Sequence, residues 1–482
     1  MSRVERPDPG EPLPRMIAEG LLSRVAGAAL VGGNAVRLLR DAAENYPAWL
    51  DAIASAERSI QFENYIIAAD EIGAKFADAL IGKARDGVKV RVLYDWLGNV
   101  ARTPARFWSR LQDAGVDVRC FNPPSIDSPL GWLSRNHRKT LGVDGRIGFV
   151  SGLCVGRDWV GDAARGVAPW RDTGVEIHGP AVADVERAFA RSWAAAGAPL
   201  PSADLPPPAA AEIAGTGVAL RVIETQPNTM ALYRMDQLVA ALARESLWLT
   251  DAYFVGTTAY VAALCEAAKA GVDVRLLVPG ASDIPIAQTL SRAGYRPLLE
   301  AGIRVFEWKG PMLHAKTAVA DGRWARLGSS NLNLASWLGN WELDVAIEDD
   351  GFAAEMESMY LDDLENSTEI VLEGNALRPT LPRRSRGQPR RPGSAGRMAA
   401  GAIGLGNAVA AAVTEHRALG PAEARVMAAV GAILLGAAAV AVLLPRLLTI
   451  PFALIAAWIA VSLLVRALRL RRSRPKRDHP AA

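Results

Sequence analysis

The chain has 482 residues, half of them hydrophobic and 22% charged, which exceeds one ordinary domain and suits two medium domains with additions. The formal charge of +3 conceals an asymmetry, because fourteen basic residues lie in the segments 378–397 and 466–477. The other 40 basic residues are outnumbered by 51 acidic ones, so the rest of the chain is acidic. This distribution argues against an enzyme that acts on nucleic acid, in which basic residues belong on the folded body.

Residues 1–35 form an N-terminal extension without a continuous apolar stretch behind a basic start, so we expect no cleavable signal peptide. The three cysteines, Cys120, Cys154 and Cys265, have neither disulfide nor metal-ligand spacing. This usage indicates a reducing, cytosolic setting for the folded part.

The chain contains an internal duplication, in which three segments of the first half recur in the second. The matching pairs are ERSIQFENY with ESLWLTDAY (57–65 and 245–253), RDGVKVRVLY with KAGVDVRLLV (85–94 and 269–278), and AGVDVRCF with AGIRVFEW (114–121 and 301–308). In each copy, apolar strands alternate with helical stretches, which predicts an α/β fold with a mainly parallel sheet. We expect two similar halves, 36–196 and 218–373, joined by a Pro/Ala-rich linker at 197–217.

The character of the sequence changes after residue 373. Residues 374–424 read as a basic linker with a possible interfacial helix, and two uncharged runs of 19 residues follow, at 426–444 and 447–465. A spanning helix needs about 20 apolar residues, so we predict two transmembrane helices within 425–466, turning at Pro445 and Arg446. Arginine-rich flanks, including the tail 467–482, place both ends of this hairpin in the cytoplasm. The alternative is a buried helical pair in a soluble domain.

The pattern His-x-Lys-x-x-x-x-Asp occurs twice, at equivalent places in the repeat. Its residues are His137, Lys139 and Asp144 in the first copy and His314, Lys316 and Asp321 in the second. In a strand, residues two apart share a face, so each His and Lys can point at one phosphate. One copy alone is a weak signal, but two in register within a duplication are specific.

Two histidines suit the chemistry of a phosphodiester, whose negative charge repels nucleophiles and whose alkoxide leaving group needs a proton. One neutral imidazole can attack phosphorus while the other, protonated, supplies that proton. The lysines neutralise the non-bridging oxygens, which is electrostatic stabilisation without a metal. The sequence has no acid or histidine cluster with metal spacing, and we expect neither metal nor cofactor.

Four further residues complete the predicted site. Asp172 and Glu342 each follow a tryptophan and can orient the imidazoles, although a solvated acid at a strand start is the alternative. Ser329 and Asn331 offer a hydroxyl and an amide near the phosphate. We group Asp144 and Asp321 with the catalytic motif but expect them to brace the loop rather than react.

These motifs resemble the phospholipase D superfamily over residues 36 to 370, and the duplicated arrangement with a membrane tail is similar to bacterial cardiolipin synthases. The resemblance implies two halves that form a pseudo-dimer with the site at their interface. It also implies a phosphohistidine, with His137 as nucleophile, His314 as acid and base, and Asp172 and Glu342 as their carboxylate partners. One departure is Cys154, which stands where the family often has Asn, so the site is asymmetric.

The leading function is phosphatidyl transfer between two phosphatidylglycerol molecules, giving cardiolipin and glycerol. We expect a multi-pass protein of the bacterial inner membrane, with a cytoplasmic catalytic domain, anionic phospholipid partners, and no nucleic-acid or protein partner. Hydrolysis to phosphatidic acid is the main alternative, since the same histidine can activate water. A nuclease of the same superfamily and a non-catalytic lipid-binding protein are the others.

Overall fold

The computed structural model describes residues 15–125, 133–206, 217–373 and 376–379, with single helical positions between 432 and 461. These residues form a 16-stranded sheet in the order β16-β15-β11-β10-β9-β12-β13-β14-β8-β1-β7-β6-β5-β2-β3-β4. The strands before the linker are β1 (Val31–Arg40), β2 (Ser59–Asn64), β3 (Lys89–Asp95), β4 (Asp117–Phe121), β5 (Lys139–Val143), β6 (Ile147–Ser151) and β7 (Thr173–His178). Those after it are β8 (Val218–Thr225), β9 (Ser246–Thr250), β10 (Asp273–Pro279), β11 (Arg304–Trp308), β12 (Thr317–Ala320), β13 (Trp324–Gly328), β14 (Glu342–Glu348), β15 (Ser367–Glu373) and β16 (Ala376–Pro379).

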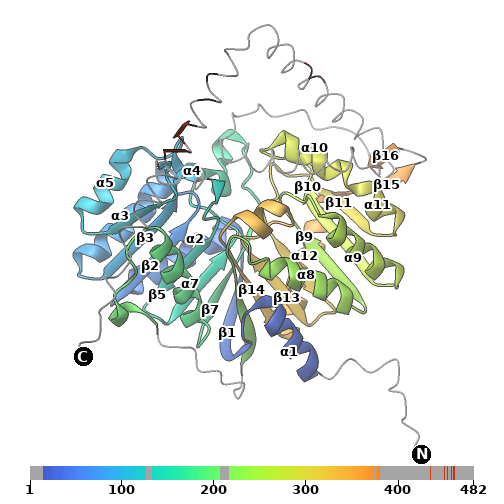
Figure 1. Ribbon diagram of the computed structural model, residues 1–482, viewed down its shortest axis with the longest axis horizontal. Helices are drawn as coiled ribbons and strands as arrows, with labels where there is room; N and C mark the ends of the chain where they lie inside the picture. Colours follow the sequence, from blue (N-terminus) through green and yellow to red (C-terminus); the bar gives the residue numbers. More distant parts are fainter. Residues whose placement is uncertain are drawn as a thin grey trace, which may run out of the picture.

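The repeat in the sequence corresponds to a repeated order of seven strands in the sheet. The order β8-β14-β13-β12-β9-β10-β11 repeats β1-β7-β6-β5-β2-β3-β4, and β1 pairs antiparallel with β8 where the copies meet. We call the part from β1 to the helix α7 (Val182–Ala195) the first half and the part from β8 to β16 the second half. Figure 1 shows them side by side, the first in blue to green and the second in green to orange.

The prediction of a mainly parallel sheet is wrong. Only β2-β3-β4 and β9-β10-β11 run parallel, and every other ladder among the described strands is antiparallel. The reason lies in two tight hairpins, β5-β6 and β12-β13. Their turns contain Asp144-Gly145 and Asp321-Gly322, all four with positive φ, which is the backbone that type I′ hairpin turns require.

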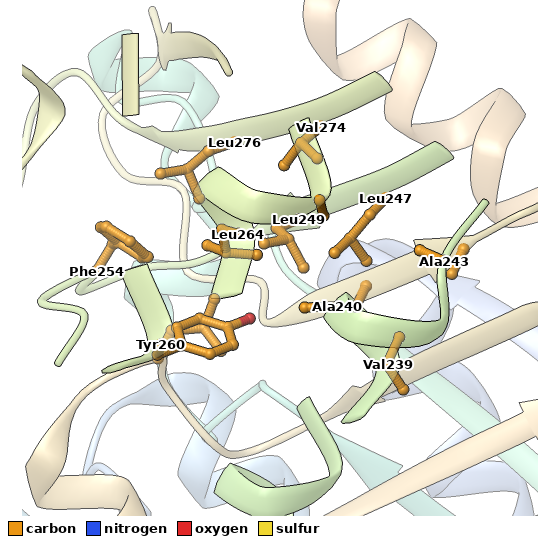
Figure 2. Packing of buried hydrophobic residues seen from close by; sticks show 14 of the residues in the cluster. Val239, Ala240, Ala243, Leu247, Leu249, Phe254, Tyr260, Leu264, Val274 and Leu276 are labelled. Atoms are coloured by element: carbon orange, nitrogen blue, oxygen red, sulfur yellow. The ribbon is translucent and has the colours of Figure 1, made fainter. Parts of the chain in front are cut away.

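Helices cover both faces of the sheet. Those of the first half are α2 (Asp41–Ser55), α3 (Glu71–Arg85), α4 (Trp96–Asn99), α5 (Ala105–Asp113), α6 (Arg157–Val160) and α7; those of the second are α8 (Ala231–Leu242), α9 (Thr258–Lys269), α10 (Pro285–Ala293), α11 (Tyr295–Glu300) and α12 (Asp350–Glu365). In the second half, Leu247, Leu249 and Leu264 pack into one apolar core between α8, α9 and the sheet (Figure 2). Such burial is the main stabilising term of the fold.

A further core joins the halves. It contains residues of β1, β7 and α7 together with residues of β8, β14 and α12, so one set of apolar side chains spans the seam. Helix α12 contacts β1 and helix α7 contacts β8, so the last helix of each half lies against the first strand of the other. The two halves are therefore a single packing unit at the place where they meet.

The N-terminal extension does not stand apart from the fold. Helix α1 (Arg15–Ala26) lies within it, and Leu22 and Ala26 belong to the apolar core of the second half, beside α8. Strand β1 also begins inside the segment that we assigned to the extension. The chain before residue 36 thus contributes to the packing of both halves.

The predicted transmembrane hairpin lies outside the described residues, apart from single helical positions such as Leu435, Ile450 and Val461. Within the described part of the chain, no helix has the length and apolar character needed to cross a membrane.

Candidate active site

Both motif histidines lie at the same edge of the sheet. His137 precedes β5, and Lys139 at the start of β5 pairs with Asn64 at the end of β2. In the second half, Thr317 follows Lys316 and pairs with Thr250 at the end of β9. Because β5 and β12 run antiparallel to their neighbours, their first residues lie beside the carboxyl ends of the parallel strands, the edge where α/β proteins commonly bind ligands.

The backbone of each histidine is held by the other half. The amide of His137 donates to the carbonyl of Trp341 (2.9 Å), and the amide of His314 donates to the carbonyl of Arg171 (2.7 Å). Trp341 and Arg171 come directly before the two predicted carboxylates. These matched contacts bring each histidine next to the acid of the opposite half.

The side chains complete this exchange. The Nδ1–H of His137 donates to Glu342, 2.9 Å from Oε2, and the Nδ1–H of His314 donates to Asp172, 2.7 Å from Oδ2. The sequence suggested the two carboxylates but not that they cross between the halves. A carboxylate on Nδ1 fixes the tautomer and leaves Nε2 as the reactive nitrogen.

Each carboxylate also accepts a hydrogen bond from a residue that the sequence reading missed. Trp159 Nε1 donates to Asp172 (2.9 Å), and Ser336 Oγ donates to Glu342 (2.7 Å). Trp159 follows Cys154 by five residues and Ser336 follows Asn331 by five, so the two donors occupy equivalent places in the repeat. This equal spacing marks the two residues as equivalent in the sequence. The equivalence was missed because an indole and a hydroxyl are different chemical groups.

The buried charges favour neutral imidazoles beside ionised carboxylates. Burial, together with the nearby lysine, lowers the pKa of His314 to about 4, and burial also lowers the pKa of His137. Burial raises the pKa of Asp172, but its contact with His314 outweighs this and brings the pKa to about 2. The pKa of Glu342 is lowered in the same way through His137.

The two motif lysines lie directly beneath the histidines and are almost completely buried. The Nζ of Lys139 donates to the carbonyl of His137, and the Nζ of Lys316 donates to the carbonyl of His314. Burial lowers both pKa values, that of Lys316 to about 8. The lysines still supply positive charge beneath the histidines, where an anionic phosphate would be stabilised.

The histidines open into a pocket of about 120 Å³ between the halves. Tyr65 lies edge-on to His137 (ring centroids 4.9 Å apart), and its repeat equivalent Tyr253 lies edge-on to His314 (6.0 Å). Cys154, Asn331, Trp159, Trp170, Arg102 and Arg135 also line this pocket. Its lining therefore combines aromatic side chains with charged and polar ones.

Ser329 and Asn331, the two predicted phosphate contacts, have different surroundings. Asn331 faces the pocket, and its buried Oδ1 has no hydrogen-bond partner among the described residues. Ser329 instead accepts a hydrogen bond from the amide of Leu343 (2.9 Å), and its carbonyl accepts from His137. Ser329 thus contacts His137 through its carbonyl, and its hydroxyl is hydrogen-bonded to the backbone of Leu343. Cys154 lines the pocket at the place equivalent to Asn331, with a thiol whose pKa is raised by burial.

Asp144 and Asp321, grouped with the catalytic motif in the sequence, lie at the opposite ends of β5 and β12 from the histidines. Each lies beyond the far end of its strand and accepts hydrogen bonds from three consecutive backbone amides. Asp144 accepts from residues 57–59 (2.7–2.8 Å), and Asp321 accepts from residues 244–246 (2.8–3.1 Å). They brace the starts of β2 and β9, as the sequence reading expected for the loop.

No group of three or more histidine, cysteine or acidic residues in the described ranges is arranged to hold a metal ion. In these ranges the predicted site residues at the pocket are two imidazoles, their two carboxylates, the two lysines and the amide of Asn331; Asn333 and Asn340 also line the pocket.

Comparison with known proteins places this geometry in a family. The family described as cardiolipin synthase, PLD-like domain, matches residues 49–193 and 239–364. Cardiolipin synthase A of Pseudomonas aeruginosa is 35% identical over 362 residues, which cover 73% of this chain and 71% of the relative. Cardiolipin synthase A of Pseudomonas fluorescens is 35% identical over 353 residues, 71% of each chain.

A solved structure shares the fold. Phosphatidylserine synthase of Haemophilus influenzae superposes with a TM-score of 0.56 at 16% identity, covering 73% of this chain and 92% of that one. The two matched halves define a phospholipase D-like protein. The chain belongs to the cardiolipin synthase family, and the resemblance seen in the sequence is confirmed.

Proposed function

We propose that this protein synthesises cardiolipin by transferring a phosphatidyl group from one phosphatidylglycerol to another, with release of glycerol. Membership of the cardiolipin synthase family and about 35% identity to two cardiolipin synthases A support this reaction. The observation that carries the mechanism is the crossed pairing of His137 with Glu342 and His314 with Asp172. It supplies two oriented imidazoles that face one pocket.

In the first step, Nε2 of neutral His137 attacks phosphorus and the bond from phosphorus to the glycerol head group breaks. His314, protonated, gives its proton to the departing glycerol oxygen. The anionic phosphodiester raises the pKa of both imidazoles when it binds, which favours a proton on His314. Asp172 stabilises the imidazolium, and Lys139 and Lys316 offset the charge on the non-bridging oxygens.

In the second step, the roles of the histidines reverse. His314, now neutral, removes the proton from the primary hydroxyl of a second phosphatidylglycerol, whose oxygen attacks the phosphohistidine. The bond from phosphorus to His137 breaks, cardiolipin leaves, and the enzyme regains its starting protonation state. Two transfers at one phosphorus consume two phosphatidylglycerols and yield one cardiolipin and one glycerol.

Analysis of the lipid products separates transfer from hydrolysis. Full-length protein in vesicles that contain phosphatidylglycerol is expected to give cardiolipin and glycerol in equal amounts. The variant His137→Ala is the matched control and should give neither. Glycerol accompanied by phosphatidic acid, without cardiolipin, would show that water is the acceptor and would reject the transferase proposal.

We also propose that the uncharged runs 426–444 and 447–465 cross the bacterial inner membrane as a hairpin and hold the catalytic halves on the cytoplasmic side. The lengths of the runs and their arginine-rich flanks support this topology. Protease added to inverted membrane vesicles should digest the catalytic halves, whereas right-side-out vesicles should protect them. Digestion in right-side-out vesicles only would contradict the proposed orientation.

A further inference from the structure

Five exposed apolar side chains lie in or beside the segments that line the pocket, which include loops, α6 and the short helix Ala335–Gly339. Val100, Leu133, Val160, Val167 and Leu338 are each 36–50% exposed, although large aliphatic side chains are usually buried. Leu133 lines the pocket itself, and each of the other four lies within three residues of a pocket-lining residue. We call these five residues the apolar rim.

Direct contacts tie the rim loops to one another. Arg102, two residues after Val100, forms an ion pair with Asp158 at 3.0 Å, two residues before Val160. Ser134, next to Leu133, donates to the carbonyl of Gly339 (2.8 Å), next to Leu338. The first contact joins the loop after α4 to α6, and the second joins the two halves. Both pairs of segments contribute lining residues to the same pocket, so the rim residues lie near one opening.

The pocket is small for a phospholipid. Its volume of about 120 Å³ compares with roughly 300–1,000 Å³ for pockets that enclose a whole drug-sized ligand. A phosphate with its glycerol head group suits this space, whereas two acyl chains do not. If the substrate is a phospholipid, its acyl chains must lie outside the described pocket, next to the apolar rim.

From these observations, we propose that the apolar rim inserts into the surface of the phospholipid bilayer, so that a head group enters the pocket while its acyl chains stay in the membrane. This inference rests on the proposed lipid substrate, and it adds a second membrane contact that does not depend on the C-terminal hairpin. Aliphatic side chains at the boundary between head groups and acyl chains bind by the apolar area that they bury. The partner of the rim is the bilayer and not a second protein chain.

The most direct test places a small environment-sensitive fluorescent amino acid at position 133 of the full-length protein in phosphatidylglycerol vesicles. The matched control carries it at position 205, where Leu205 is similarly exposed but does not line the pocket. Lipids with a quencher on the acyl chain should quench the probe at 133 and leave the probe at 205 unaffected. An unquenched probe at 133, or one whose signal changes only with protein concentration, would overturn the inference.

A kinetic test uses the rim variant Val100→Asn/Val160→Asn/Leu338→Asn, which leaves the pocket lining intact, and the control variant Leu205→Asn/Leu361→Asn, whose leucines are exposed elsewhere. With long-chain phosphatidylglycerol in vesicles, the rim variant should lose about tenfold or more in kcat/KM, and the control should keep its activity. With water-soluble dihexanoyl phosphatidylglycerol below its micelle concentration, both should match the unmodified protein. Equal losses on both substrates would contradict a role at the bilayer.

The two experiments separate this inference from the proposed function. If the products prove to be phosphatidic acid and glycerol, the transferase proposal fails while quenching at position 133 still supports the rim. If cardiolipin forms but position 133 is not quenched, the function stands and the rim inference fails.

Discussion

His137 of the first half donates a hydrogen bond from Nδ1 to Glu342 of the second half, at 2.9 Å. The reverse exchange joins His314 to Asp172 at 2.7 Å. Neither motif histidine takes its carboxylate from its own half, so both imidazoles are oriented in this way only when the halves are packed together. The apolar core that spans the seam is therefore a condition for the chemistry as well as for stability.

The first prediction concerns the carboxylate of the crossed pair. Glu342→Gln keeps the size of the side chain but removes the charge that orients His137 and stabilises its protonated form. By analogy with the loss of the acid in histidine-dependent hydrolases, kcat should fall by roughly 10²–10⁴-fold. Steady-state kinetics with circular dichroism would measure the effect. Glu71→Gln, which alters an exposed ion pair, is the control and should be unchanged.

The second prediction separates the motif aspartates from the chemistry. Asp144→Ala leaves three backbone amides without their acceptor, so the free energy of unfolding should fall by about 1–3 kcal/mol. The folded fraction should keep kcat within about twofold, because Asp144 does not reach the histidines. Denaturant unfolding and kinetics at low temperature would test both statements. A stable variant that had lost kcat would show that Asp144 has a catalytic role after all.

The third prediction follows from the lowered pKa of His314, about 4 in the folded protein against about 6.5 when unfolded. Between these values the unfolded chain binds a proton that the folded chain does not. The contribution of this group to stability is therefore fully present above pH 6.5 and decreases as the pH falls toward 4. Other buried acids titrate in the same range, so the comparison must be made against a variant.

His314→Gln removes that contribution. Relative to the unmodified protein, the slope of unfolding free energy against pH between 4.5 and 6.5 should decrease by up to about 1.4 kcal/mol per pH unit. Urea unfolding at several pH values measures this slope. Identical slopes for the two proteins would mean that His314 titrates in the folded state as it does in the unfolded chain.

The fourth prediction uses the asymmetry between Asn331 and Cys154, which occupy equivalent places in the pocket. A thiol is a weak donor, so the amide of Asn331 is expected to carry the phosphate contact. Asn331→Ala should reduce kcat/KM by roughly 10²–10³-fold, which is the usual cost of one lost donor to a developing charge. Cys154→Ala should reduce it by less than about threefold. Similar losses in both variants would show that the thiol contributes as much as the amide.

Much of this site could be predicted from the sequence because a functional residue in one copy of the repeat identifies its equivalent in the other copy. Two motifs in register imply that His137 and His314 are equivalent, and the resemblance to the phospholipase D superfamily implied that the two motifs meet at the interface of the halves. The equivalence of the two copies also identified Asp172 and Glu342. The sequence did not show that each carboxylate binds the histidine of the opposite half, because a repeat is compatible with pairing inside a half or across the seam.

The parallel sheet was wrongly predicted, and several contacts were not predicted at all, for reasons that can be traced to particular residues. The sheet was predicted to be mainly parallel because strand–helix alternation dominates 57–121 and 245–308, while the Asp-Gly pairs at 144–145 and 321–322 were read only as part of the motif. The same pairs are strong hairpin signals. Trp159 and Ser336 were missed because they are chemically unlike, and the packing of α1 on the second half depends on long-range contacts of Leu22 that no local pattern encodes.

Trapping of the covalent intermediate shows directly which histidine is the nucleophile. Full-length protein is mixed with phosphatidylglycerol that carries a labelled phosphate, quenched under alkaline conditions that preserve phosphohistidine, and the modified residue is located by mass spectrometry. We expect label on His137 alone, and none in His137→Ala. Label on His314, or labelling that persists in His137→Ala, would contradict it.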